Sequence, residues 1–103
     1  MRRVRIHATA AEEAAEAAAW YEKERPGLGE DFLRAVDAAL ELLEAEIVPL
    51  AVVPGAAGKR GAKRLLLRRF PYAIVVRESA TELVVIAFAH ASRKPGYWRG
   101  RLP

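Results

Sequence analysis

The spacing of apolar residues changes once along this chain, near residue 50, and that change limits the folds open to it. Between residues 10 and 47, apolar side chains recur every three or four positions, which is the period of a helix with one buried face. Between residues 63 and 89, strand-length runs are rich in β-branched and aromatic residues. A helical segment followed by a β-rich segment, without internal repeats, predicts a small α+β fold.

A short strand is expected before the helices, because residues 2–7 alternate basic and apolar side chains with a period of two. Thr9 precedes Glu12 by three positions, which is the spacing of a capping box, so we expect the first helix to start at Thr9. Residues 10–24 are rich in Ala and Glu and continue this helix. Its narrow buried stripe should consist of Ala14, Ala17, Ala18 and Tyr21.

A second helix is predicted from Leu28 to Ile47, after the break at Pro26-Gly27, with Pro49 ending it. Two helices joined by so short a break form an antiparallel hairpin. The amphipathic pattern predicts a buried face made of Phe32, Val36, Leu40, Leu43 and Ile47.

The second half of the chain should supply most of the sheet. Residues 54–58 are expected to form a loop, and strands are predicted at 63–70, 72–78 and 82–89. Residues 95–101 are long enough for one helical turn or an ordered tail. The predicted fold is a single domain over residues 1–103 with the order β-α-α-β-β-β, in which a helical hairpin packs on a mainly antiparallel sheet and a short C-terminal tail follows.

Composition excludes several classes of protein. The chain has no cysteine, so disulfides, zinc–thiolate sites and thiol nucleophiles are excluded. It has no run of about 18 apolar residues that would cross a membrane. The arginines near the N-terminus are not followed by the apolar core of a signal peptide. We therefore expect a soluble cytoplasmic protein.

The net charge of +4 conceals a strong asymmetry between the two halves. Residues 1–50 carry 11 acidic and 6 basic side chains, whereas residues 51–103 carry 2 acidic and 11 basic ones. The halves therefore have net charges of −5 and +9. This distribution predicts one surface for a polyanion and a separate surface for another partner.

Four segments together resemble the RelE/ParE family of bacterial toxins, also known as plasmid stabilisation proteins. They are AAWYE at 18–22, LGEDF at 28–32, KRLLLRRFPYAIV at 63–75 and HASRKPGYWRGR at 90–101. The likeness extends over nearly the whole chain. It implies the toxin of a type II toxin–antitoxin system, which arrests growth and is held inactive by a cognate antitoxin.

The resemblance leaves the target open between two branches of the family. RelE-like toxins cleave mRNA on the ribosome, and ParE-like toxins inhibit DNA gyrase without nuclease chemistry. The candidate residues in the C-terminal segment slightly favour RNA cleavage that needs no metal, and gyrase inhibition is kept as the alternative. A third possibility is an inactive module that only binds the antitoxin.

Candidates for such chemistry lie close together after the last predicted strand. RNA cleavage without a metal needs a base, a cation that stabilises the phosphorane and an acid for the leaving oxygen. His90 suits either proton transfer, Arg93 can hold a phosphate bidentately, and Tyr97 matches the tyrosine of RelE-like toxins. Because a free phenol has a pKa of about 10, surrounding cations would have to lower the pKa of Tyr97.

Each candidate also has a plainer structural interpretation. His90 is placed to hydrogen-bond the backbone at the end of a strand, and Tyr97 beside Trp98 is placed to fold the tail onto the sheet. Arg93 has no acidic neighbour in the sequence, which makes it the best functional candidate. His7 is expected to be a solvated residue at the end of the first strand.

No metal or other cofactor is expected. The sequence has no plausible spacing of metal ligands, no Ser-His-Asp set and no glycine-rich phosphate loop after a strand. The acidic residues of the helices are expected to be solvated; they are Glu12, Glu13, Glu16, Glu22 and Glu24.

The basic half predicts a nucleic-acid surface. In an extended strand, Arg64 and Arg68 share one face and Lys63 and Arg69 share the other, so at least one face should border a groove or a partner. A basic sheet edge that discourages aggregation, or a surface for an acidic antitoxin segment, would explain the same residues. The predicted contacts are Lys59, Arg60, Lys63, Arg64, Arg68, Arg69, Lys94, Arg99 and Arg101.

Overall fold

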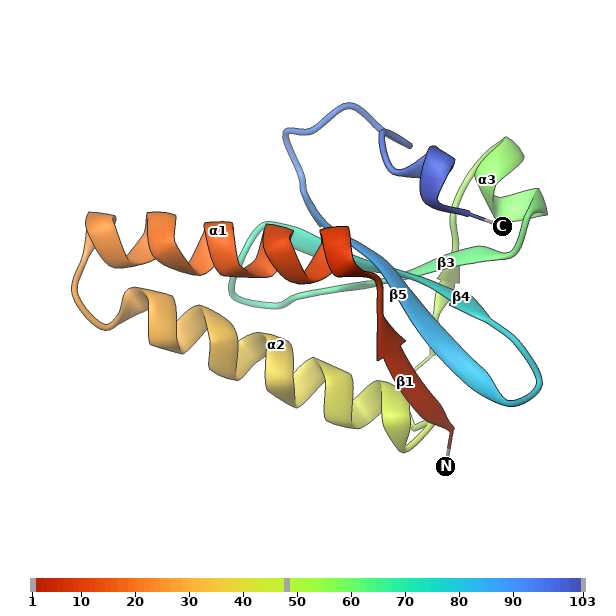
Figure 1. Ribbon diagram of the computed structural model, residues 1–103, viewed down its shortest axis with the longest axis horizontal. Helices are drawn as coiled ribbons and strands as arrows, with labels where there is room; N and C mark the ends of the chain where they lie inside the picture. Colours follow the sequence, from red (N-terminus) through yellow and green to blue (C-terminus); the bar gives the residue numbers. More distant parts are fainter. Residues whose placement is uncertain (1, 48, 103) are drawn as a thin grey trace.

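A five-stranded sheet separates a helical hairpin on one face from the C-terminal tail on the other (Figure 1). The computed structural model describes residues 2–47 and 49–102. The elements, in chain order, are β1 (Arg3–Ile6), α1 (Ala8–Glu24), α2 (Leu28–Glu44), β2 (Ala51–Val52), α3 (Ala56–Lys59), β3 (Ala62–Leu66), β4 (Tyr72–Glu78), β5 (Glu82–His90) and the 3-10 helix η1 (Arg99–Arg101). The predicted α+β fold with a mainly antiparallel sheet is confirmed.

The strand order is β1-β5-β4-β3-β2, so the first and last strands of the chain are neighbours. β1 runs parallel to β5, and the other three pairings are antiparallel. The pairing of β1 with β5 ends at Ile6 and Val85, and β5 continues alone on that side. A bulge interrupts the β4–β5 ladder, because Val75 pairs with Ala87 and Val76 with Val85.

The first helix begins earlier than the sequence predicts. His7, not Thr9, is the N-cap of α1: its Nδ1 accepts a hydrogen bond of 3.2 Å from the backbone N–H of Thr9. The carbonyl of His7 also accepts a hydrogen bond of 3.0 Å from the N–H of Ala11, which is the first hydrogen bond of the helix. Thr9 therefore lies inside the helix and is not the N-cap that a Thr9–Glu12 capping box requires. The expectation of a merely solvated His7 is therefore wrong, since its side chain is half-buried and caps a helix.

The tight hairpin between α1 and α2 depends on Glu22 and two glycines. The Glu22 carboxylate accepts hydrogen bonds of 3.0 Å from the N–H of Gly27 and 3.1 Å from the N–H of Gly29, which satisfies the exposed start of α2. Gly27 has a φ of 89°, in the left-handed region that favours glycine. Glu22 is therefore a capping residue of the second helix as well as an exposed side chain of the first.

The second helix ends three residues before its predicted end. α2 ends at Glu44, and Ala45 is its C-cap. The chain then turns away at Glu46, whose φ of 58° lies in the left-handed region. Ile47 was expected on the buried face but is 71% exposed. The helix has no further buried surface to gain after Leu43, which is 1% exposed, so it ends before Pro49 is reached.

Three details of the second half also differ from the sequence prediction. The segment 54–58 is not simply a loop, because it contains most of α3, where Ala57 is 4% exposed and packs under the tail. The short edge strand β2 was not predicted. β3 ends at Leu66, so Arg68 and Arg69 lie in the turn before β4 and not on the two faces of a longer strand.

Two apolar clusters, one on each face of the sheet, hold the layers together. On the helical face, the rings of Tyr21, Phe32, Phe70 and Tyr72 pack with centroid separations of 5.0 to 6.4 Å. On the opposite face, Trp98 of the tail is 4% exposed. This second cluster consists of Val53, Ala57, Ala62, Val75, Ile86, Ala87, Trp98 and Leu102. The tail is thus part of the folded core.

Candidate functional site

The C-terminal tail is fixed by Glu13 of α1, Tyr97 and Arg101, which we call the tail anchor. Tyr97 Oη donates to Glu13 Oε2 at 2.5 Å, and Arg101 Nη1 donates to Glu13 Oε1 at 2.8 Å. The side chains of Arg101 and Glu13 are only 18% and 14% exposed. Charge-assisted bonds in so dry a place are strong, so the tail anchor joins the tail firmly to the first helix.

The tail anchor also hydrogen-bonds the backbone of β5 beyond the end of β1, where β5 has no partner strand on that side. The N–H of Phe88 donates to Glu13 Oε1 at 3.1 Å, and Arg101 Nη1 donates to the carbonyl of Ile86 at 3.1 Å. These two backbone groups would otherwise face an open sheet edge. Side chains therefore replace a strand here, which gives Arg101 and Tyr97 a structural role.

The environment of Tyr97 raises the pKa of its hydroxyl above the ordinary value. Burial is the main cause, and the hydrogen bond to the Glu13 carboxylate and its negative charge act in the same direction. Arg93 and Arg101 oppose the shift but are outweighed. The condition set from the sequence, that cations lower this pKa, is therefore not met.

His90 lies at the end of β5, where its ring nitrogen Nδ1 is occupied. Nδ1 accepts from the backbone N–H of Ser92 at 2.9 Å and lies 2.8 Å from Ser92 Oγ. The backbone N–H can only donate, so in the neutral ring Nδ1 holds the lone pair and Nε2 carries the proton. The imidazole stands at 90° to the ring of Tyr72, with centroids 5.0 Å apart. Hydrogen bonding to the backbone at the strand end is thus what this side chain does here.

Arg93 lies over the face of Tyr97, with its guanidinium carbon 3.9 Å from the ring centroid. Within the described residues it forms no ion pair. Arg93 is exposed, so its charge is open to a partner. Among the three residues proposed for chemistry, it is the one whose functional group remains uncommitted.

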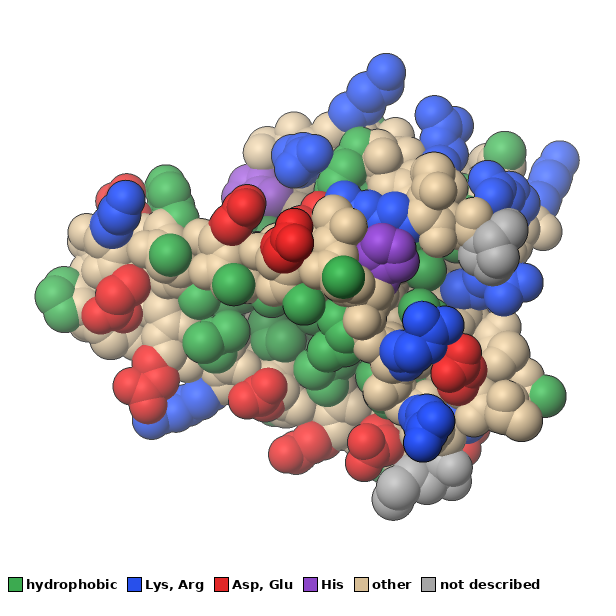
Figure 2. All heavy atoms as spheres, in the orientation of Figure 1, with side chains coloured by type: hydrophobic (Ala, Val, Ile, Leu, Met, Phe, Trp, Pro, Cys, Tyr) green, Lys and Arg blue, Asp and Glu red, His purple; other side chains and the backbone are tan. Residues whose placement is uncertain are grey.

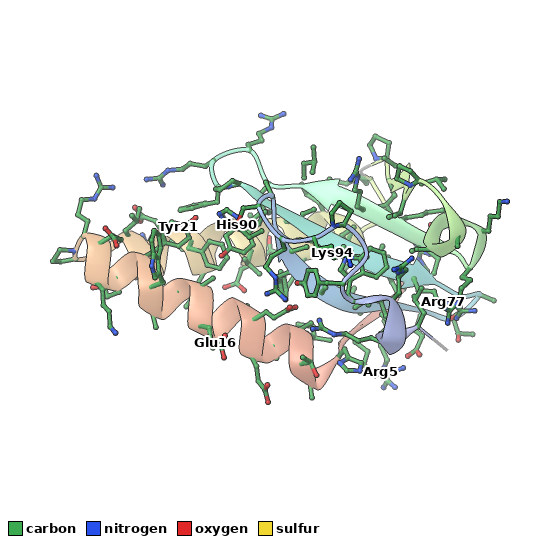
Figure 3. The ribbon with its side chains drawn as sticks, turned by 90° about the horizontal axis from the view of Figure 1, so that it is seen from above. Arg5, Glu16, Tyr21, Arg77, His90 and Lys94 are labelled. Atoms are coloured by element: carbon green, nitrogen blue, oxygen red, sulfur yellow. The ribbon has the colours of Figure 1, made fainter. Side chains whose placement is uncertain are left out.

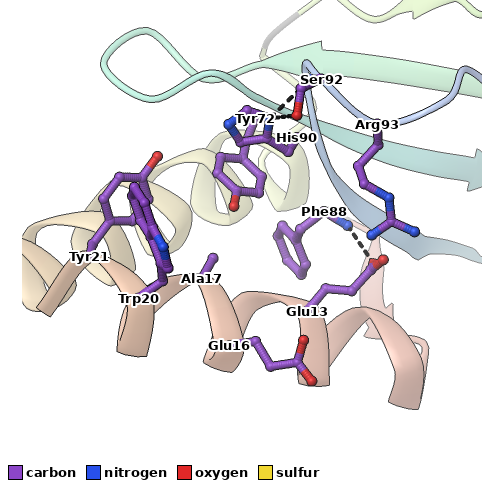
Figure 4. A pocket seen from close by; sticks show the side chains of 10 residues that line it. All are labelled: Glu13, Glu16, Ala17, Trp20, Tyr21, Tyr72, Phe88, His90, Ser92 and Arg93. Carbon is purple, nitrogen blue, oxygen red and sulfur yellow. Dashed lines mark hydrogen bonds between the residues drawn. The ribbon is translucent and has the colours of Figure 1, made fainter. Parts of the chain in front are cut away.

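Two cavities meet at Tyr72, His90 and Arg93. The smaller, the helix-side pocket, has a volume of about 330 Å³ and lies between α1 and the end of β5 (Figure 4). Figure 4 shows Trp20 and Tyr21 at one end of it and Arg93 at the other, pointing toward α1. Its lining consists of Glu13, Glu16, Ala17, Trp20, Tyr21, Tyr72, Phe88, His90, Ser92 and Arg93. Two carboxylates and one arginine make this pocket a poor place for a phosphate.

The larger cavity, which we call the tail groove, has a volume of about 670 Å³ and lies between the tail and the sheet face opposite the helices. Seen from above in Figure 3, Lys94 lies on the tail over the sheet, while Glu16 lies on the outer side of α1. No Asp or Glu among the described residues lines the tail groove. Its walls are apolar, and the basic residues at its border are Arg64, Arg93, Lys94 and Arg99.

The basic residues predicted to bind nucleic acid do not form one surface. Lys63 pairs with Glu78 at 2.6 Å and Arg69 pairs with Asp31 at 3.3 Å. Arg60 donates to the carbonyl of Leu102, and Arg101 belongs to the tail anchor. Lys59 and Arg68 are exposed away from the groove lining. Only Arg64, Lys94 and Arg99 lie together, at the tail groove.

The separation of charge expected from the sequence is visible on the surface. Figure 2 shows acidic side chains over the two helices and basic ones over the tail and α3. Some acidic residues nevertheless have roles that the sequence prediction missed, above all Glu13. A signal was present: Glu13 follows Ala10 by three positions and precedes Ala17 by four, so it lies beside the buried stripe of α1.

The described residues contain no cluster of His, Cys, Asp and Glu side chains suited to a metal ion. None of the described helices is long and apolar enough to cross a membrane. At the end of β5, the tail is therefore held by Glu13, the His90 ring is hydrogen-bonded to Ser92, and Arg93 lies between the two cavities without an ion pair among the described residues.

Neither a family model nor a curated protein matches the sequence. The structure, however, is similar to a solved one: a chain of the chromosomal ParDE TA system from P. aeruginosa superposes on it with a TM-score of 0.75. The match covers 89% of this chain and 98% of that chain, at 15% sequence identity. The chain has the RelE/ParE-like fold. The fold expected from the resemblance is therefore confirmed.

Within the RelE/ParE-like fold, the positions that the resemblance singled out have distinct local roles. Trp20 and Tyr21 form the helical wall of the helix-side pocket, and the turn at Phe70-Pro71 brings Phe70 into the helical core. The segment 90–101 carries the tail anchor and the border of the tail groove. The likeness thus rests on residues that shape the tail and both cavities.

Proposed function

We propose that the protein is the toxin of a type II toxin–antitoxin pair and arrests growth by binding its target, without cutting RNA. The RelE/ParE-like fold and the match to a chain of a ParDE TA system support the first part. By the resemblance, DNA gyrase is the target of toxins that act in this way, and a cognate antitoxin neutralises them.

One observation carries the second part: the groups that would move protons are already committed. His90 Nδ1 accepts from Ser92, which leaves Nε2 protonated, so the exposed nitrogen of the neutral ring cannot take the proton of a 2′-hydroxyl. Tyr97 donates to Glu13, and its raised pKa makes it a poor acid for a leaving oxygen. Arg93 alone would stabilise charge without providing proton transfer.

Ribosome-associated mRNA cleavage remains the second candidate because of Arg93. Its guanidinium forms no ion pair within the described residues, and it lies between the two cavities with His90 Nε2–H nearby in the lining. These two donors match a phosphate group. A nuclease would have to free His90 from Ser92 when RNA binds.

Induced expression separates these functions. The wild-type chain, expressed without the protein encoded beside it, should stop growth, and co-expression of that neighbour should restore it. Purified toxin should abolish supercoiling by gyrase and leave mRNA on translating ribosomes intact. His90→Ala should retain full inhibition of gyrase. Cleaved mRNA that becomes intact with His90→Ala would support the nuclease instead, and normal growth on induction would contradict a toxin.

A further inference from the structure

We infer that the helix-side pocket binds a small dipolar ligand, with a guanidinium group at one end and a carboxylate at the other. This is the chemistry of arginine, either as the free amino acid or as the carboxyl-terminal residue of a polypeptide. The inference is independent of the proposed toxin function and would stand if the protein did not arrest growth.

One end of the helix-side pocket offers an open aromatic face beside an unpaired carboxylate (Figure 4). Trp20 is 58% exposed, which is unusual for so large an apolar side chain, and none of the described Arg and Lys side chains lies over its ring. Glu16 precedes Trp20 by four positions on α1, so the two side chains share one face of the helix. Glu16 forms no ion pair within residues 2–47 and 49–102. A planar guanidinium can stack on the indole and pair with this carboxylate at the same time.

The opposite end of the pocket carries positively charged hydrogen-bond donors. Figure 4 shows the Arg93 side chain reaching toward α1, and its N–H groups form neither an ion pair nor a hydrogen bond among the described residues. The neutral His90 ring adds an Nε2–H donor, because its Nδ1 accepts a backbone hydrogen bond. Glu13, the second carboxylate of the lining, is already paired with Arg101 and offsets little of this charge. Two such donors suit a carboxylate.

The two ends are far enough apart to select a long ligand. Trp20 and Glu13 are seven residues apart on α1, which corresponds to about 10 Å along the helix axis. Arg93 points to the Glu13 end of the pocket in Figure 4. Between the ends, the rings of Tyr72 and Phe88 offer apolar surface to an aliphatic stem. The volume of about 330 Å³ lies near the lower limit of the range of about 300 to 1,000 Å³ that is typical of ligand sites, so a single amino acid suits it better than a longer segment.

The opposite charges at the two ends disfavour ligands that carry only one sign of charge. A diamine would place an ammonium group beside Arg93, and a dicarboxylate would place a carboxylate beside Glu16. Like charges at these positions repel each other. Arginine avoids both contacts because its guanidinium and its carboxylate lie at opposite ends of one flexible chain.

Titration calorimetry with four small probes tests the class of ligand. L-Arginine and N-acetyl-L-arginine carry both charged ends, whereas agmatine lacks the carboxylate and L-citrulline lacks the cation. At least one of the first two should bind, and agmatine and citrulline should bind at least tenfold more weakly than that one. Tighter binding of N-acetyl-L-arginine would identify the carboxyl-terminal residue of a polypeptide as the source, and tighter binding of L-arginine would identify the free amino acid. Equal binding of agmatine or citrulline, or no binding of any probe, would overturn the inference.

The two tryptophans report where the ligand binds. Trp20 lines the helix-side pocket, whereas Trp98 lines the tail groove on the other face of the sheet. In NMR titrations, the tighter arginine probe should shift the indole N–H signal of Trp20 and leave that of Trp98 unchanged. A shift of the Trp98 signal alone would place the ligand in the tail groove and contradict the inference.

Substitutions at each end of the pocket test the two charged contacts separately. Arg93→Gln should weaken binding of the arginine probe about tenfold, because a charge-assisted hydrogen bond is lost. Glu16→Gln should weaken it about fivefold, since this ion pair would be more exposed. Glu41→Gln removes an exposed carboxylate of α2 outside the pocket lining and should bind like the wild type. Circular dichroism checks that all three variants fold, and wild-type affinity in both pocket variants would show that the inference is wrong while leaving the toxin function untouched.

Discussion

Tyr97 Oη and Glu13 Oε2 are 2.5 Å apart, although 84 positions separate the two residues in the chain. This contact joins the first helix to the C-terminal tail at the edge of β5. Glu13 also accepts hydrogen bonds from the N–H of Phe88 and the guanidinium of Arg101, so one carboxylate of α1 holds both β5 and the tail. The stability of the tail, and with it the shape of the tail groove, therefore depends on a residue of α1.

Replacing Glu13 by alanine should lower the free energy of unfolding by about 2–4 kcal/mol, because it removes the partly buried acceptor of Arg101 and of the Phe88 N–H. Glu16→Ala, one turn further along α1, should change it by less than about 0.5 kcal/mol, since Glu16 is exposed. Urea denaturation followed by circular dichroism measures both. Equal effects of the two substitutions would contradict the tail anchor.

Tyr97→Phe should lower the free energy of unfolding by about 1.5–3 kcal/mol, the usual contribution of a hydrogen bond to a charged acceptor. The ring itself remains, so the stacking of Arg93 should persist. On the proposed function, this variant should inhibit supercoiling by gyrase as strongly as is expected of the wild type. A variant that folds normally but no longer arrests growth would show that the hydroxyl acts on the target.

The free energy of unfolding at alkaline pH should also depend on the Tyr97 hydroxyl. Because the folded state raises the pKa of Tyr97 above its ordinary value of 10.0, the unfolded chain loses this proton first. Stability from this group is therefore complete below pH 10 and declines as the pH rises above it. Tyr97→Phe should therefore show a smaller decline in stability between pH 9 and pH 11 than the wild type. An unchanged slope would exclude this coupling.

Acid should act mainly through Glu78. The pKa of Glu78 is lowered mainly by the hydrogen bond from Lys63 and then by the one from Arg2. Stability from this group is therefore complete above the ordinary pKa of 4.5 and is lost as the pH falls below it. Glu78→Gln should cost about 1–2 kcal/mol at pH 7 and little at pH 3. Glu24→Gln, at the exposed end of α1, should be neutral at both. A pH-independent cost for Glu78→Gln would contradict the assignment.

Gly29→Ala should destabilise the protein by about 1–3 kcal/mol through overpacking. A Cβ at this position would overlap the carbonyl oxygen of Ala18 and lie 3.0 Å from the Cβ of Glu22, so α2 would have to move away from α1. Gly100→Ala is the control, because a Cβ there meets nothing within 4 Å. Thermal denaturation compares the two; a stable Gly29→Ala variant would mean that the hairpin is less tightly packed.

Hydrophobic periodicity predicted most of this fold because it reports which faces are buried. The stripe of α1, the hairpin at Gly27 and the strands β4 and β5 are where the pattern placed them. The end of α2 was missed, because the pattern continues to Ile47 while the surface that buries it ends at Leu43. β2 and α3 were missed because elements of two and four residues have no measurable period.

The site was harder to predict, since its contacts join segments that no local pattern relates. The sequence placed His90, Arg93 and Tyr97 within eight positions, and the structure does bring their surroundings together. It could not reveal that Tyr97 donates its hydroxyl hydrogen bond to Glu13. Nor could it reveal that three of the predicted phosphate-binding cations are paired with acids: Lys63 with Glu78 of the same half, and Arg69 and Arg101 with acids of the first half. Counting charge by halves therefore overestimated the free positive charge of the second half.

The order of the strands has a consequence for synthesis on the ribosome. β1 is made first, but the strand it pairs with, β5, spans Glu82–His90, and the tail that covers the same edge follows it. A nascent chain that has reached Glu78 has both helices and most of the sheet, yet its first strand has no partner and its Glu13 carboxylate has no tail to hold. Assembly of the sheet and of the groove beneath the tail must therefore wait for the last segments to be translated, so a prematurely terminated chain would lack the tail groove.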